Sequence, residues 1–359
     1  MDTTLPRLDD PGPGTGLAEI PGDSYESTWD MLEQRLWGDG LPVVPPTPDR
    51  VKRFVEASGR DPKEVIGVIP VRRGQASVEV IAANAVMAGC APEYMRVVIA
   101  AVKAATKPEV NLASLQPTTH PAAALIVVNG PIRQELKMNW GSGAFGPGNR
   151  ANATIGRALR LVMINVGGAR PGDGDFSTQG QPSKYTYCIA ENEEQNPWGS
   201  LAQARGFEPG QNVVTVAPAE NPHNINEHVG ETAPYILDNM SATIANIGAN
   251  NPHTMITPEM WLFVCPEHAE AISKGGFDRK NMQRFLYEHA RITLGAHKRG
   301  PMWGMHDWPI WMEGTNPDAQ LPIVVEPERF NIVVVGGPGR QSSWAPSNGG
   351  CRPASVLVE

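Results

Sequence analysis

A glycine-rich run leads directly into a predicted helix near the middle of the chain. Residues 141–148 read GSGAFGPG, and the apolar spacing that follows predicts a helix over residues 149–166. Backbone N–H groups at the start of a helix, beside the positive end of its dipole, favour the binding of anions. We therefore expect Gly146 and Gly148 to lie against a negatively charged ligand.

Polar residues of this predicted helix strengthen that expectation. On a helix, Arg150 and Arg157 lie within about 20° of each other, on the face opposite the apolar residues. Guanidinium groups bind carboxylate or phosphate through two hydrogen bonds at once, so these arginines and Asn149 could clamp such a group. Asn152 falls on the apolar side and needs hydrogen-bond partners if it is buried. The alternative is a solvated basic face that pairs with nearby carboxylates.

The same glycines also match the spacing G-x-G-x-x-G at Gly141, Gly143 and Gly146. In dinucleotide-binding proteins a buried strand comes immediately before this motif. Here residues 134–140 read QELKMNW, which is no buried strand. We therefore expect no dinucleotide cofactor, and hydride transfer is disfavoured as the reaction.

Three glutamates, Glu191, Glu193 and Glu194, follow a weakly alternating segment at residues 184–190 that predicts a strand. Proteins of the α/β class place ligands outside the carboxyl ends of their strands, and a carboxylate there could act as general acid or base. Lys184, at the start of the segment, could neutralise the charge of a substrate. An acidic loop and a lysine that simply face water are the alternative.

Among the four cysteines, Cys90 has the clearest chemical setting. It lies just before a predicted helix that starts near Pro92, where the helix dipole lowers a thiol pKa and favours the thiolate. Glu93 is close enough to transfer protons, although its negative charge opposes thiolate formation. Cys351 is a second candidate, because neighbouring glycines give access and Arg352 favours the anion. No Cys-x-x-Cys spacing occurs, and a buried small apolar side chain is the ordinary alternative for each thiol.

A metal site is the remaining possibility among the motifs. His223, Glu227 and His228 lie close together in sequence, but a histidine spacing of five does not match helical zinc sites. On a loop the three side chains could still bind one divalent metal. Ordinary loop histidines are the alternative, so the sequence leaves the cofactor open, with a divalent metal as a candidate.

The elements that must position these residues follow from the apolar pattern. Four continuous apolar runs end in loops that contain proline, at residues 124–128, 212–216, 261–264 and 331–335. Such runs are typical of strands buried on both faces, in parallel or mixed sheets covered by helices. The fold class is therefore α/β. We expect a disordered N-terminal arm over residues 1–25, an α/β lobe with the glycine-rich loop and candidate site over 26–200, and a second α/β lobe over 201–359.

Composition narrows the functional class. The 359 residues include 37 glycines and 34 prolines, which indicates many specified turns, and the formal net charge is −8. An acidic chain does not favour binding to nucleic acid or to an anionic membrane surface. No run approaches the roughly 18 apolar residues of a membrane helix, and the start of the chain has no secretory signal. We expect a cytoplasmic protein with reduced thiols.

Five segments together resemble a known family: residues 40–47 (GLPVVPPT), 88–94 (AGCAPEY), 128–131 (VNGP), 146–158 (GPGNRANATIGRA) and 190–194 (AENEE). They are similar to a bacterial family of cytoplasmic proteins, the larger companions of proteins with the UGSC (Sec-Gly-Ser-Cys) motif. The chain itself has no Cys-Gly-Ser-Cys segment. The resemblance implies a heteromeric partner, and it implies as positions to test Cys90, Glu93, Asn149, Arg150, Asn152, Arg157, Lys184, Glu191, Glu193 and Glu194.

These observations favour an enzyme that acts on a small anionic, carboxylate-bearing metabolite or xenobiotic. Hydrolase or lyase chemistry would use a carboxylate as acid or base, with Cys90 as a candidate nucleophile. Two alternatives stay open. One is a metal-dependent hydrolase or lyase that uses the His/Glu residues, and the other is a non-catalytic subunit of a hetero-oligomer. We expect the chain to form homo- or hetero-oligomers.

Overall fold

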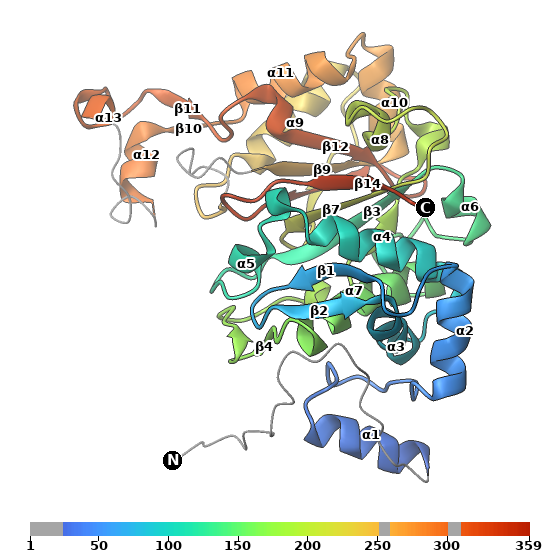
Figure 1. Ribbon diagram of the computed structural model, residues 1–359. Helices are drawn as coiled ribbons and strands as arrows, with labels where there is room; N and C mark the ends of the chain where they lie inside the picture. Colours follow the sequence, from blue (N-terminus) through green and yellow to red (C-terminus); the bar gives the residue numbers. More distant parts are fainter. Residues whose placement is uncertain (1–23, 251–258, 301–309) are drawn as a thin grey trace.

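The computed structural model describes residues 24–250, 259–300 and 310–359. Its elements form four layers in the order helices, sheet, sheet, helices (Figure 1). The α/β class predicted from the sequence is confirmed. The predicted arm lies outside the described residues, except that Ser24 caps helix α1 (Tyr25–Gln34), which begins at Tyr25.

The first sheet lies next to the helices of the N-terminal half. Its strand order is β14 (Ala354–Leu357), β7 (Val213–Ala219), β3 (Ala123–Asn129) and β6 (Cys188–Ala190). Strands β3 and β6 run parallel and the other neighbours are antiparallel. On its outer face lie α4 (Met95–Ala105) and α7 (Arg150–Asn165), and α2 (Pro48–Ser58) and α3 (Val78–Ala88) pack against these helices.

The second sheet has the strand order β12 (Phe330–Val334), β9 (Met260–Val264), β13 (Gln341–Pro346) and β8 (His223–Asn226). Strands β12 and β9 are parallel, and the other pairs are antiparallel. Its outer face packs against α9 (Ala233–Ile244), α10 (Pro266–Lys274) and α11 (Arg279–His289).

Successive side chains of a strand point to opposite faces of its sheet, which explains why the strand sequences are apolar throughout. In β3, Leu125 and Val127 point between the two sheets, whereas Ile126 and Val128 point toward the helices. The second sheet contributes Trp261 and Phe263 to the layer between the sheets. Both faces of each sheet are therefore buried, as the continuous apolar runs predict.

The two sheets share one pattern of strand order and direction, but the chain does not divide between them at residue 200. After β7 the chain crosses to the second sheet and adds β8, and after β13 it crosses back and adds β14. The first sheet thus takes two of its strands from beyond residue 200. The predicted boundary between residues 26–200 and 201–359 does not separate the two sheets.

Shorter elements complete the described chain. They are β1 (Val65–Ile69), β2 (Gly74–Ser77), α5 (Leu112–Leu115), α6 (Ile132–Glu135), β4 (Arg170–Pro171), β5 (Gly174–Asp175), α8 (Leu201–Ala204), β10 (Arg291–Thr293), α12 (Leu294–Arg299), α13 (Ile310–Gly314) and β11 (Gln320–Pro322). Among the described helices, none has the length and apolar character needed to cross a membrane.

Candidate functional site

The polar residues at the start of helix α7 hold the glycine-rich loop that precedes it. The Asn149 side chain accepts a hydrogen bond from the Asn152 N–H at 3.0 Å, so it caps the helix, and its amide donates to the Lys137 carbonyl. Asn152 is buried and bonds both backbone groups of Asn139, as well as the Ala144 carbonyl. These amides hold the glycine-rich loop to the helix, while Gly146 and Gly148 are exposed.

Arg150 and Arg157 are occupied by distant parts of the chain. Arg150 donates to the carbonyls of Gly89 and Cys90, both at 2.9 Å. Arg157 binds Asp39 through two hydrogen bonds of 2.8 Å and also donates to two carbonyls of the following segment. The predicted anion clamp of Asn149, Arg150 and Arg157 is therefore not formed. The alternative, arginines paired with nearby acceptors, describes this face of α7.

The surroundings of Cys90 do not favour a nucleophilic thiolate. Its thiol is buried and donates to the Thr154 carbonyl, and burial raises its pKa to about 12, against the weaker opposing effect of Thr154 and two arginines. Glu93 is exposed. Desolvation outweighs any effect of the following helix, so the prediction for Cys90 and Glu93 is not supported by the geometry. Burial likewise raises the pKa of Cys351.

The three glutamates after β6 hold strand ends together. Glu191 is fully buried and accepts hydrogen bonds from Asn129, Asn196 and the Leu201 N–H, at 2.6–2.7 Å. Burial raises the pKa of Glu191 despite these donors.

Glu193 and Glu194 both pair with Arg133, which is itself buried. Glu193 also accepts from the Asn129 amide and the Gly130 N–H. All three carboxylates thus have partners within the protein, Glu191 in the interior and Glu194 at the surface, and they join β3, β6, α6 and α8.

The predicted metal ligands do not converge. The Glu227 carboxylate accepts hydrogen bonds from the N–H groups of Val229 and Gly230. His223 is exposed and lies edge-on to Trp344, and the His228 ring contacts Gln341. In the parts of the chain that the structure describes, no group of three or more His, Cys, Asp or Glu side chains could hold a metal ion.

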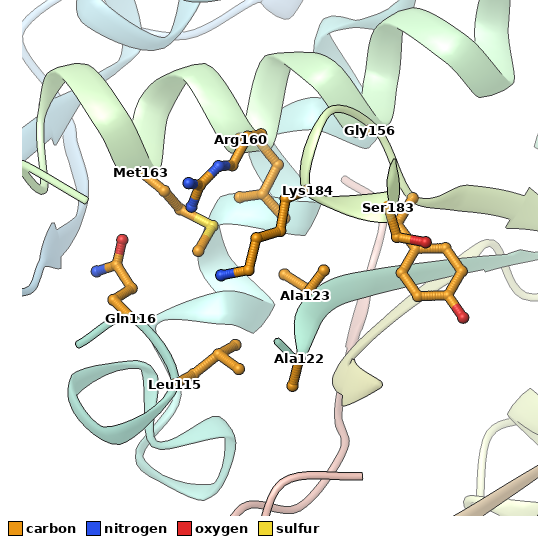
Figure 2. Close-up of a pocket in the computed structure, with 12 residues that line it drawn as sticks. Leu115, Gln116, Ala122, Ala123, Gly156, Arg160, Met163, Ser183 and Lys184 are labelled. Atoms are coloured by element: carbon orange, nitrogen blue, oxygen red, sulfur yellow. The ribbon is translucent and has the colours of Figure 1, made fainter. Parts of the chain in front are cut away.

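A different cavity lies at the amino end of β3, beside α7 (Figure 2). Its empty space is about 340 Å³, counted out to open solvent. The space is narrow, with room between the side chains for about one water molecule. Its polar lining comes from Gln116 after α5, Arg160 on α7, and Lys184 at the end of the 3₁₀ helix η3 (Pro182–Lys184).

Gly156 allows this cavity wall to form. A Cβ atom at Gly156 would lie 2.4 Å from the Thr186 hydroxyl oxygen and 2.7 Å from the Tyr187 backbone nitrogen. The missing side chain lets α7 approach the segment before β6 closely. As a result, Arg160, one turn further along the helix, lies next to Lys184 in the cavity wall.

Asp175 joins the two cations. Its Oδ2 atom lies 2.8 Å from both the Lys184 amine and the Arg160 guanidinium, and its Oδ1 accepts from the backbone and hydroxyl of Ser177. Burial alone would raise the pKa of Asp175, but hydrogen bonds from Lys184 and Ser177 and the two cations bring it below its ordinary value. Burial lowers the pKa of Lys184, and Asp175 only partly opposes this.

Gln116 is the unexplained member of this cavity. Its side chain is 1 % exposed, and neither its oxygen nor its nitrogen has a hydrogen-bond partner among the described residues. Buried amides without partners are rare because each unpaired group costs about 1–3 kcal/mol. Figure 2 shows the Lys184 amine and the Arg160 guanidinium on the side of the cavity where the Gln116 amide lies. A ligand or water in this space would satisfy all three.

Comparisons with family models, with curated proteins and with solved structures found no match to this chain. The candidate site therefore rests on the geometry of the chain itself. The sequence predicted Lys184 as a ligand-binding residue, and the structure places it in a cavity. It missed Gln116, Asp175 and Arg160, although the spacing of Gly156, Arg160 and Met163 on one helix face could have indicated a shared wall.

Proposed function

We propose that this chain is an enzyme that binds a small carboxylate between Arg160, Lys184 and Gln116 and acts on it by lyase chemistry. The ligand class is the one expected from the sequence, but the site is a different one. One observation carries the proposal. Two cations share a single Asp175 oxygen, and they line the same cavity as a buried amide that has no partner.

Donors remain for a ligand after all internal bonds are counted. Within the described residues, Arg160 uses only Nη2, toward Asp175 and the Ala169 carbonyl, which leaves Nε and Nη1. The Lys184 ammonium uses one of its three protons. Together with the Gln116 amide, these donors suit the two oxygens of one carboxylate, and hydrogen bonds between ions of opposite charge are the strong ones.

Lys184 is the group best placed to transfer a proton. Burial lowers the pKa of Lys184 below that of an exposed lysine, against the opposing effect of Asp175. In its unprotonated form the Lys184 amine can remove a proton next to the substrate carboxylate, which Arg160 and Gln116 then hold. The resulting ammonium can return that proton to the leaving group. Hydrolysis is less well supported, because both oxygens of Asp175 are already occupied and no Asp or Glu is among the described residues that line the cavity.

A thermal-shift series with acetate, pyruvate and malonate as probes tests this proposal. We expect these carboxylates to raise the melting temperature of the wild-type chain, because a ligand that binds only the folded state stabilises it. Gln116→Leu should abolish the shift while keeping the fold, since it removes an unpartnered amide at similar volume. Arg150→Ala, which changes the other helix face, should keep the shift.

The outcomes separate the competing sites. If Gln116→Leu keeps the shift and Arg150→Ala loses it, the ligand binds at the helix start and the proposed cavity is wrong. If no carboxylate stabilises the wild-type chain, the proposed substrate class fails, and the non-catalytic subunit becomes the better interpretation.

A further inference from the structure

A second cluster with chemical potential lies at the carboxyl end of β9, in the other half of the molecule. Cys265 follows this strand and is the N-cap residue of α10. The Cys265 N–H donates to the Ser342 hydroxyl at 3.0 Å, and that hydroxyl lies 3.5 Å from the Cys265 sulfur. His268, in the first turn of α10, places Nδ1 2.7 Å from the same hydroxyl oxygen. Ser342 therefore bridges a thiol and an imidazole.

Hydrogen bonding fixes how protons can be arranged here. The His268 Nε2 atom lies 2.8 Å from the Glu227 carbonyl, which can only accept, so Nε2 carries a proton. A neutral ring would then accept at Nδ1 from the Ser342 hydroxyl. In the charged arrangement the Nδ1–H donates to Ser342, whose hydroxyl donates to the Cys265 thiolate. Ser342 can thus relay the thiol proton to His268 without any movement of heavy atoms.

The surrounding groups shift the pKa values of Cys265 and His268 in the directions that favour the charged arrangement. Burial by itself would raise the pKa of Cys265, but hydrogen bonds from His268 and Ser342 bring it below its ordinary value. Burial would lower the pKa of His268, yet Cys265 and the Glu227 carbonyl raise it. The first turn of α10 adds the positive end of its dipole.

Other charged groups near the cluster have their own partners. The Glu227 carboxylate is bound by two backbone N–H groups, and Glu267 accepts from the Gly339 N–H. Arg340 donates to the carbonyls of His228 and Gly230, and its charge lowers the pKa of His268. None of these groups replaces Ser342 as the contact between sulfur and ring.

We propose that Cys265, Ser342 and His268 form a thiolate–imidazolium site whose sulfur reacts with hydrogen peroxide. Cys265 is 2 % exposed, so only a small reagent is expected to reach its sulfur. The thiolate attacks one peroxide oxygen, so that an S–O bond forms as the O–O bond breaks. The departing hydroxide takes the proton held on His268, relayed through Ser342, and leaves as water. The sulfur becomes a sulfenic acid, oxidised by the two electrons that the peroxide accepts.

Two of the other buried thiols, those of Cys90 and Cys188, provide internal controls. Burial raises the pKa of Cys90 to about 12, and it raises the pKa of Cys188 still further. Neither thiol should oxidise at neutral pH. Ser241 is a matched control for Ser342, because it is a buried serine of the same half whose hydroxyl has no partner among the described residues.

The experiment measures thiolate formation and oxidation on the full chain. The ultraviolet absorbance of the wild-type chain and of Cys265→Ser is measured over a range of pH. The difference between the two gives the titration of the Cys265 sulfur in the folded protein. We expect a midpoint below about 8.5, the ordinary value for a cysteine. After hydrogen peroxide at neutral pH, peptide mass spectrometry should find one added oxygen on Cys265 and none on Cys90 or Cys188. Ser342→Ala should slow this oxidation at least about tenfold, and Ser241→Ala should not.

The proposal is overturned by a midpoint at or above the ordinary value, by the absence of oxidation at Cys265, or by equal rates in Ser342→Ala and Ser241→Ala. If Ser342→Ala fails to fold, the wild-type absorbance difference still decides, because it needs no change at the serine and no entry of a reagent.

Discussion

Arg157 binds the carboxylate of Asp39 through two hydrogen bonds, each 2.8 Å long. The two residues are 118 positions apart in the chain, and both side chains are largely buried. This pair fastens the segment before α2 to the middle of α7. It also explains why an arginine on a basic helix face is not available to a ligand.

Arg157→Ala should destabilise the fold without affecting a bound carboxylate. Removing one partner of a buried ion pair leaves the other charge unpaired, which costs about 3–5 kcal/mol. Chemical denaturation measures the loss, and the double variant with Asp39→Ala should recover part of it. A variant of unchanged stability that no longer responds to carboxylates would restore the original anion clamp.

Carboxylate binding should weaken as the pH rises through the pKa of Lys184. The ammonium form attracts the ligand, and the pKa of Lys184 lies below its ordinary value of about 10.4. Affinity should therefore fall at a lower pH than for an exposed lysine site. Calorimetric titration of acetate across the alkaline range measures this. Lys184→Arg, which stays charged, should move the loss to higher pH, and an identical profile would exclude Lys184 from the site.

Gly156→Ala should close the cavity and destabilise the protein. The added methyl group meets the backbone nitrogen of Tyr187 and the Thr186 hydroxyl at less than 3 Å. Overpacking of this kind costs about 1–3 kcal/mol. Gly314→Ala is the control, because nothing lies within 4 Å of a Cβ atom there. Thermal melting with and without pyruvate reads both effects, and a Gly156→Ala variant that melts like wild type and still binds would contradict the described wall.

Glu191→Ala should act on stability and not on ligand binding. It removes the acceptor of the Asn196 amide and of the Leu201 N–H, and one of the two acceptors of the Asn129 amide, in a fully buried place. Each unpaired donor costs about 1–3 kcal/mol. We expect a large fall in denaturation midpoint with an unchanged carboxylate shift in the protein that remains folded. A stable variant that loses the shift would instead return this glutamate to the active site.

Local patterns predicted the elements well. The helix expected over residues 149–166 is α7 (Arg150–Asn165), and the four apolar runs are β3, β7, β9 and β12. These elements follow from periodicity and burial, which are properties of neighbouring residues.

The partners of the polar residues could not be predicted in the same way. Arg150 is fixed by a carbonyl 61 positions away, and Lys184 and Gln116 line one cavity only because α5, α7 and η3 come together in the fold. The chain also crosses between the sheets to form β8 and β14, and local periodicity does not indicate to which sheet a strand belongs. The sequence therefore indicated Lys184 but not its cavity, and it indicated two arginines of α7 that are bonded within the protein.

That crossing between the sheets has a consequence for biosynthesis. Strand β7 has β14 as its outer neighbour, and β14 lies more than a hundred positions further along the chain, at Ala354–Leu357. While the ribosome is still making the intervening segment, the first sheet of the nascent polypeptide lacks β14. The backbone N–H and C=O groups on the outer edge of β7 are then unpaired and can bind a strand of another chain. Premature arrest of translation should thus yield a species that aggregates rather than a stable half-molecule.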